Sequence, residues 1–143
     1  MLYLVGIGTM CGLKMKNIVL DYIAAINEAD LDRILSLMSD DHIMIDSQDH
    51  KMTGKDNLRQ AWIGYFGLFP DYKIEVNEIL EKDSLICILG YASGTYKNLK
   101  NDDNSNFWKI PLALAAIIKD NYISQWQIYA DNLVVIDIIN KNK

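Results

Sequence analysis

The spacing of apolar residues along this chain changes once, near Pro70. Before this proline, apolar side chains recur every three or four residues, which is the spacing of one face of an α-helix. After it they recur mostly at every second residue, as along β-strands. The pattern therefore predicts helices first and a meander of antiparallel strands second, an α+β fold with the helices on one face of a sheet.

The first half is expected to form three helices and one short strand. Residues 17–28 carry the first apolar helical face, and Asp30 is placed to cap a second helix. A third helix is predicted to begin near Thr53, where Thr-Gly-Lys-Asp matches a Ser/Thr-x-x-acidic start signal, and to end at Pro70. Between these helices, residues 42–46 alternate as a strand and the following SQDHK predicts a turn.

The second half is rich in β-branched and aromatic residues and predicts four strands. Two segments within them, 85–92 and 110–118, are apolar at both parities, whereas a strand with one wet face alternates. Because the helices cover only one face, we expect the other to meet a second copy of the chain, giving a homodimer through the sheet. The alternative is an apolar face left in solvent. The predicted strands span 72–80, 85–96, 107–118 and 122–131.

Residues 1–14 stand outside this pattern. Their apolar run is too short to span a membrane and has no basic residue before Lys14, so it lacks the charged front of a signal peptide. We predict a dispensable N-terminal extension at 1–14 followed by a single domain at 15–143. The alternative is an additional N-terminal strand or arm.

Composition removes several classes of partner. Half of the residues are apolar, 23% are charged and the net charge is −5, with no basic stripe, so neither nucleic acid nor a membrane is expected as a partner. Cys11 and Cys87 fit no metal spacing and are predicted to be free thiols in a reducing, cytoplasmic compartment. His42 and His50 have no cysteine near them, so no metal and no cofactor are predicted.

Three stretches resemble a known family. FPDYKIEVNEILEKDSLICILGYASGTY (69–96) and IIKDNYISQWQIYAD (117–131) resemble SnoaL-like proteins, and YIAAINEADLDRILSLMSDD (22–41) is similar to the opening helices of ketosteroid isomerases. The resemblance implies the nuclear transport factor 2-like fold: a cone-shaped, strongly curved, mostly antiparallel sheet with three N-terminal helices and a pocket between them. Such proteins often dimerise through the sheet.

The resemblance also implies which residues line that pocket. The set is aromatic and aliphatic, which suits an apolar or aromatic small molecule. The alternative is that the same side chains fill a solid core. The predicted ligand-binding residues are Met44, Trp62, Phe66, Leu112, Leu114, Trp126 and Ile128.

Two catalytic residues follow from the isomerase resemblance. Tyr22 matches the tyrosine that binds the substrate oxyanion, and Asp46 matches the general base. We expect Asp46 to point into the cone beside Tyr22, with a pKa raised by burial. The alternatives are a core tyrosine, and an aspartate that caps the SQDH turn through the backbone.

Other members of the fold are less well matched. The second oxyanion carboxyl of the isomerases would fall near Leu112–Leu114, but no aspartate occurs between Asn104 and Lys119, so steroid isomerase activity is not predicted. The Arg-x-Asp pair of the epoxide hydrolases is also missing. His42 shares its parity with Asp46 and is placed either in the pocket or, preferably, on the surface; Asp131 is given a capping role.

The function expected from the sequence is a SnoaL-like small-molecule-binding protein with an apolar pocket. A cofactor-independent isomerase or cyclase using proton transfer is one form of that hypothesis. The alternative is a non-catalytic binding or association domain of the same fold, since one fold hosts many functions.

Overall fold

The computed structural model, which describes residues 2–99, 103 and 105–143, contains every predicted helix and strand in the predicted order and adds two further elements. The predicted loop at 98–106 lies partly outside these residues. The helices are α1 (Leu2–Asn27), α2 (Leu31–Leu37), α3 (Lys55–Leu68) and α4 (Leu133–Lys141), with a 3-10 turn η1 (Tyr96–Asn98). The strands are β1 (Met38–Ile45), β2 (Lys51–Thr53), β3 (Lys73–Lys82), β4 (Leu85–Thr95), β5 (Phe107–Lys119) and β6 (Tyr122–Tyr129).

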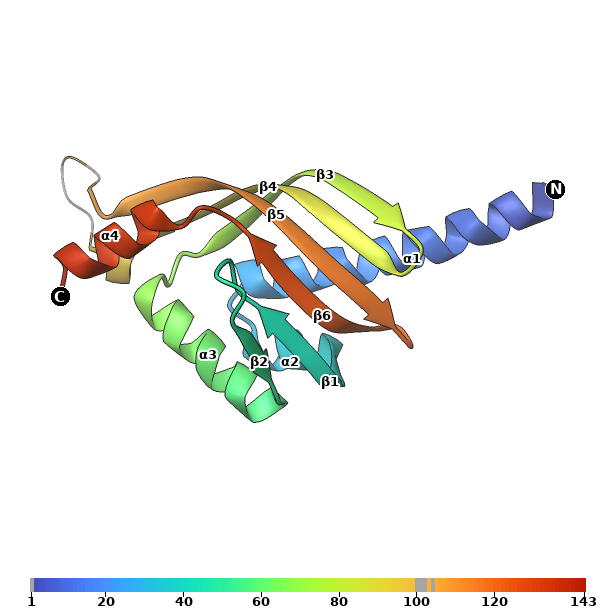
Figure 1. Cartoon of the computed structure of the whole chain (residues 1–143), viewed down its shortest axis with the longest axis horizontal. Helices are drawn as coiled ribbons and strands as arrows, with labels where there is room; N and C mark the ends of the chain where they lie inside the picture. The colour runs from blue at the N-terminus through green and yellow to red at the C-terminus, as the bar shows by residue number, and fades with distance from the viewer. Residues whose placement is uncertain (1, 100–102, 104) are drawn as a thin grey trace.

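The six strands form one curved sheet in the order β2-β1-β6-β5-β4-β3. The pair β1–β6 is parallel, and the other pairs are antiparallel. Figure 1 shows the long strands arching over α1, with α3 beside it and α4 at the end of the arch. The predicted class is confirmed: an α+β fold with a curved, mostly antiparallel sheet and three N-terminal helices.

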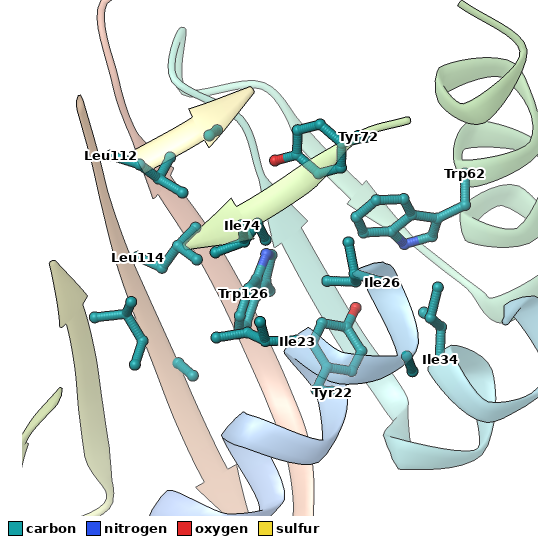
Figure 2. Packing of buried hydrophobic residues seen from close by; sticks show 14 of the residues in the cluster. Tyr22, Ile23, Ile26, Ile34, Trp62, Tyr72, Ile74, Leu112, Leu114 and Trp126 are labelled. Carbon is teal, nitrogen blue, oxygen red and sulfur yellow. The ribbon is translucent and has the colours of Figure 1, made fainter. Parts of the chain in front are cut away.

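Alternation along β5 produces the core. Trp108, Ile110, Leu112 and every second residue onward to Ile118 are buried, while their neighbours in the strand are exposed or half-buried. The buried set faces the helices, where the ring of Tyr22 lies 4.7 Å from that of Trp126 (Figure 2). The alternation predicted from the sequence therefore corresponds to the two faces of the sheet: one face is covered by the helices and the other is open.

Four elements differ from the sequence prediction. Helix α1 begins at Leu2 rather than near residue 17, so the first residues continue the helix and add no strand. Strand β1 begins at Met38, four residues before the predicted start of the strand at residue 42. Strand β2 and helix α4 were not predicted. Asn132 is the N-cap residue of α4, and Asp131 before it has a capping role: its Oδ1 accepts a hydrogen bond from the N–H of Leu133, the first residue of α4, at 3.1 Å.

The caps of the two middle helices differ from each other. Asp30 caps α2 as predicted, because its side chain accepts a hydrogen bond from the N–H of Arg33 at 3.2 Å. Helix α3 begins where the Thr53 start signal predicted, but Thr53 does not cap it. Gly54 is the N-cap residue of α3, with a φ of 89° and no side-chain hydrogen bond. Glycine reaches this positive φ without strain.

A chain that begins at Met15 is expected to keep the fold. Leu13 is 59% exposed, whereas Met15 packs against the core and is retained. The melting temperature should therefore fall by no more than a few degrees, since about 1 kcal/mol corresponds to roughly 2–4 °C in a domain of this size. Circular dichroism melts of both chains at equal concentration measure this. A larger fall would mean that the first turns of α1 belong to the domain.

Candidate functional site

A cavity of about 370 Å³ opens between the inner face of the sheet, α3 and α4. Residues of β1, β2, α3, β4, β5, β6 and α4 contribute to its wall, which is mainly apolar. Most of the polar side chains come from the loop between β1 and β2 and the start of β2. The apolar and aromatic lining residues are Met44, Met52, Ala61, Trp62, Tyr65, Tyr72, Ala92, Trp108, Ile110, Leu112, Ile128, Ala130, Val135, Ile136 and Ile139. The polar ones are Asp46, Ser47, His50, Lys51 and Asn132.

Four aromatic side chains form one wall of the cavity. The ring of Tyr65 meets those of Trp62 and Tyr72 edge to face, at 6.5 and 4.9 Å between centroids. The ring of Trp108 lies 6.1 Å from that of Tyr72. Burial raises the pKa of Tyr65 and Tyr72 above the ordinary value of a phenol, so both hydroxyls stay protonated at neutral pH. Figure 2 shows the Tyr72 hydroxyl directed towards Leu112, another wall residue.

Asp46 lies in the cavity lining, at the start of the loop to β2. Its Oδ1 accepts hydrogen bonds from the N–H groups of Gln48 and His50, both at 2.9 Å, and its Oδ2 lies 3.2 Å from Nδ1 of His50. The side chain is 48% exposed. The carboxylate therefore organises the turn, as Asx residues commonly do.

The expectation that Asp46 avoids this turn and titrates high is wrong. Burial alone would raise the pKa of Asp46, but the hydrogen bonds from the backbone of His50 and Gln48 outweigh it, and the pKa lies below its ordinary value. A carboxylate that accepts several N–H groups favours its charged form. Asp46 is thus a weaker proton acceptor than the sequence suggested.

Tyr22 is fully buried and does not reach the cavity lining. Its hydroxyl is directed towards the indole of Trp62 (Figure 2), yet neither the hydroxyl nor that indole N–H has a hydrogen-bond partner. Burial raises the pKa of Tyr22 well above the ordinary value, and the nearby Trp62 N–H offsets this only in part. The oxyanion role of Tyr22 stays a prediction. Its position in the core, away from the cavity lining, does not favour that role.

His42 is neither a surface residue nor a cavity residue, contrary to both expectations. It is 1% exposed, and its Nδ1 donates to the carbonyl oxygen of Ile123 at 2.6 Å. Its ring lies 6.4 Å from that of Tyr22. Burial lowers the pKa of His42, which the bond to Ile123 only partly counters, so the ring is neutral in the core.

The predicted ligand-binding residues divide into two groups. Met44, Trp62, Leu112 and Ile128 lie in the lining, whereas Leu114 and Trp126 are buried in the core and Phe66 is half-buried and packs against it. For Leu114 and Trp126 the reason is position along the cone: residues of the correct face fill the narrow part and leave space only in the wider part. The role of each in binding remains a prediction. The three that do not line the cavity are Phe66, Leu114 and Trp126.

Sequence reasoning missed most of the lining, and two of the missed parts left a signal in the sequence. Helix α4 closes one side through Val135, Ile136 and Ile139. The apolar spacing of residues 133–139 is helical and could have revealed it. The other missed part is the loop residue His50, which was considered only as a metal ligand. Its partnership with Asp46 at a separation of four residues was the available signal.

The described residues contain no group of three or more histidine, cysteine, aspartate or glutamate side chains that could hold a metal ion. In the part of the chain that the structure describes, no helix is both long and apolar enough to cross a membrane. Cys87 is a partly exposed free thiol, and the side chain of Cys11 lies outside the described residues.

A curved sheet with helices on one side and an apolar cavity between them defines this chain as a cone-shaped α+β protein with an internal pocket. The SnoaL-like domain matches residues 19–118, which is more than half of the chain. The chain belongs to the SnoaL-like family. No curated protein is similar enough in sequence to count as a match.

Solved structures confirm the fold at low sequence identity. A protein from Jannaschia sp. CCS1 described as a SnoaL-like polyketide cyclase has a TM-score of 0.75 at 15% identity, covering 89% of this chain and 92% of its own. A nuclear transport factor 2-like protein of unknown function from Burkholderia pseudomallei gives 0.75 at 15%, with 88% and 97% covered. A ketosteroid isomerase-like protein from Catenulispora acidiphila, in complex with trimethylamine, gives 0.68 at 16%, with 78% and 83% covered.

Proposed function

We propose that this chain binds an apolar, aromatic small molecule in the cavity between the sheet, α3 and α4. The observation that carries the proposal is the cavity itself. Its volume of about 370 Å³ lies within the range of small-molecule sites, roughly 300–1,000 Å³. Its aromatic side chains line a wall and leave the space open, and few polar groups interrupt the apolar surface.

The polar groups narrow the class of ligand. The protonated hydroxyls of Tyr65 and Tyr72 can donate hydrogen bonds, and the buried indole N–H group of Trp108 lacks an acceptor. A buried donor without a partner costs free energy that an acceptor would recover. A flat ring system carrying a carbonyl oxygen fits this environment.

Binding is the activity that the geometry supports best. The carboxylate of Asp46, which the isomerase hypothesis needs as a free base, is committed to its turn. The complex of the Catenulispora acidiphila relative with trimethylamine supports a small organic ligand for this fold. The cytoplasmic location expected from the cysteines remains part of the same proposal.

Filling the cavity from α3 should weaken binding. The probe is 2-acetylnaphthalene, an aromatic ketone, and the signal is quenching of tryptophan fluorescence, since Trp62 and Trp108 lie in the wall. Ala61→Phe places a ring in existing space and should weaken binding by about tenfold or more, because the probe and the ring compete for one volume. Trimethylamine serves as a second, cationic probe of the aromatic wall.

The matched control is Gln60→Phe, which adds the same ring on an exposed position of α3 outside the lining. It should bind the ketone as the original chain does. Equal affinity in Ala61→Phe and the original chain, or no saturable quenching in either, would contradict the proposal.

The sheet face turned away from the helices supports a homodimer as the second part of the proposal. We call this the outer face. Its centre is apolar, with Leu89 44% and Tyr129 53% exposed, and the shallow hollow beside them is lined partly by Pro111. The apolar outer-face residues are Leu85, Cys87, Leu89, Tyr91, Pro111, Ala113, Ala115, Ile117 and Tyr129.

A further inference from the structure

The polar side chains of the cavity lining include a carboxylate–imidazole pair, Asp46 and His50. The resemblance to isomerases did not predict this pair. Oδ2 of Asp46 lies 3.2 Å from Nδ1 of His50, and both residues belong to the cavity lining. The His50 side chain is 75% exposed. An imidazole held by a carboxylate at a pocket is an arrangement in which the carboxylate orients the ring and the ring moves a proton.

The hydrogen bonds of Asp46 decide how the imidazole is protonated. Its Oδ1 is taken up by the N–H groups of Gln48 and His50, and its pKa lies below the ordinary value, so it is ionised at neutral pH and accepts only. The His50 Nδ1 facing it must therefore carry the hydrogen. The lone pair of the neutral ring is then on Nε2, and no described residue forms a hydrogen bond with that nitrogen.

The backbone fixes the distance between the two side chains. The N–H of Asp46 donates to the carbonyl of His50 at 3.1 Å, and the N–H of Asp49 donates to the carbonyl of Asp46 at 3.1 Å. Asp49 takes a φ of 65°, which aspartate tolerates better than most residues. The pair is thus part of a closed loop, and two flexible side chains do not have to meet by chance.

We propose that His50 is the proton acceptor of this cavity and that Asp46 is its positioning residue. The inference rests on the proposed function, because a substrate must first bind in the cavity. The substrate class is an aromatic or alicyclic ketone with an acidic C–H beside its carbonyl group.

The proton-transfer step balances without a cofactor. Nε2 of His50 takes the proton from the carbon beside the carbonyl group, and the C–H electron pair forms a C=C bond. The C=O π electrons move to oxygen and give the enolate, while His50 becomes an imidazolium next to ionised Asp46. Return of the proton to a different carbon completes an isomerisation. General base catalysis of this kind contributes about a hundredfold or more in rate.

The other ionisable groups around His50 are few. Lys51 follows it in the lining, Asp49 precedes it in the loop, and Tyr65 and Tyr72 lie in the aromatic wall with raised pKa values. The two tyrosines do not ionise near neutrality. Loss of the rate in His50→Gln therefore reports on the His50 imidazole itself.

The test uses 5-nitro-1,2-benzisoxazole, whose ring opens when a base removes its C3 proton. The C–H electrons form the second π bond of a nitrile, the N–O bond breaks, and the nitrophenolate product is followed by absorbance. The chain should exceed free imidazole at the same pH. His50→Gln should lower kcat/KM by about a hundredfold. Asp46→Asn should lower kcat at similar KM, because the imidazole is still present but no longer held by a carboxylate.

The matched control is Asp49→Asn, which removes one negative charge from the same loop without touching the pair; its rate should equal that of the original chain. A second measurement does not depend on turnover. With only two histidines, the ring resonances of His50 and His42 separate cleanly by NMR. Adding 2-acetylnaphthalene should shift those of His50 and leave those of buried His42 in place.

Several outcomes would overturn the inference. One is a His50→Gln chain with unchanged turnover, and another is loss of the rate in Asp46→Asn alone, which would make Asp46 the base. A chain no faster than free imidazole would also reject it. If 2-acetylnaphthalene still quenches tryptophan fluorescence in these cases, the binding function stands while the catalytic inference fails.

Discussion

Gly90→Ala is expected to destabilise the fold by about 3 kcal/mol or more, at the upper end of overpacking effects. A Cβ at this position would lie 1.8 Å from the carbonyl oxygen of Glu75 and 3.3 Å from Cα of Val76. Both are backbone atoms of the neighbouring strand, so no side-chain rotation relieves the contact. The alanine can be accommodated only if β3 and β4 move apart.

The position of Gly90 explains why the strands come so close. It pairs with Val76, next to the register shift between Val76 and Glu78. A bulge bends and twists its strand. Ala92, two residues further along β4, lies in the cavity wall. The glycine thus allows the bend that helps to shape the site.

Thermal and urea unfolding at one protein concentration test this expectation. A loss of about 3 kcal/mol should lower the melting temperature by roughly 6–12 °C in a domain of this size. The control is Gly67→Ala in α3, where an added Cβ meets nothing within 4 Å. There alanine should stabilise by about 0.5–1 kcal/mol. Equal stability of Gly90→Ala and the original chain would show that β3 and β4 separate at no cost.

Leu89→Arg is expected to convert the proposed dimer into a monomer. Leu89 lies near the centre of the outer face and is 44% exposed in a single chain. In a two-fold symmetric interface the substitution occurs in both partners, so two desolvated charges of one sign replace apolar contact. We expect the dissociation constant of the dimer to increase by a factor of about one hundred or more, since central interface residues dominate the binding energy.

Light scattering gives the mass directly. The original chain should have twice the monomer mass of 16.3 kDa at micromolar concentration, and Leu89→Arg should have the monomer mass. The control is Ile63→Arg on α3, which starts from a similar exposure of 45% but lies away from the outer face; it should remain a dimer. A monomeric original chain would reject the dimer, and a dimeric Leu89→Arg would place the interface elsewhere.

The sequence determined the class of this fold because burial has a period. A helix repeats its buried face every 3.6 residues and a strand every two, so the change at Pro70 separates helices from sheet before any contact is known. The caps at Asp30 and Asp131 could also be predicted, since each side chain bonds within three residues of itself. The strands that are apolar on both faces, β4 and β5, are both interior strands of the sheet.

Only the tertiary structure decided which side chains border the cavity. Trp126 and Ile128 have the same parity on β6, yet Trp126 packs on Tyr22 in the core and Ile128 lines the open space. The difference comes from how far the sheet and helices diverge at each level of the cone. No local pattern contains that distance, and α4, which closes the site, was not predicted at all.

The role of Asp46 also depended on three-dimensional contacts. Its residue type and spacing suit a buried base or a turn cap equally well. The outcome depends on whether the N–H groups of Gln48 and His50 turn towards the carboxylate, and they do. Several short hydrogen bonds stabilise the charged form more than partial burial opposes it, so the pKa fell where the sequence suggested a rise. Periodicity fixes which face a residue occupies, whereas the balance of burial and hydrogen bonding that sets its chemistry exists only once the neighbours are in place.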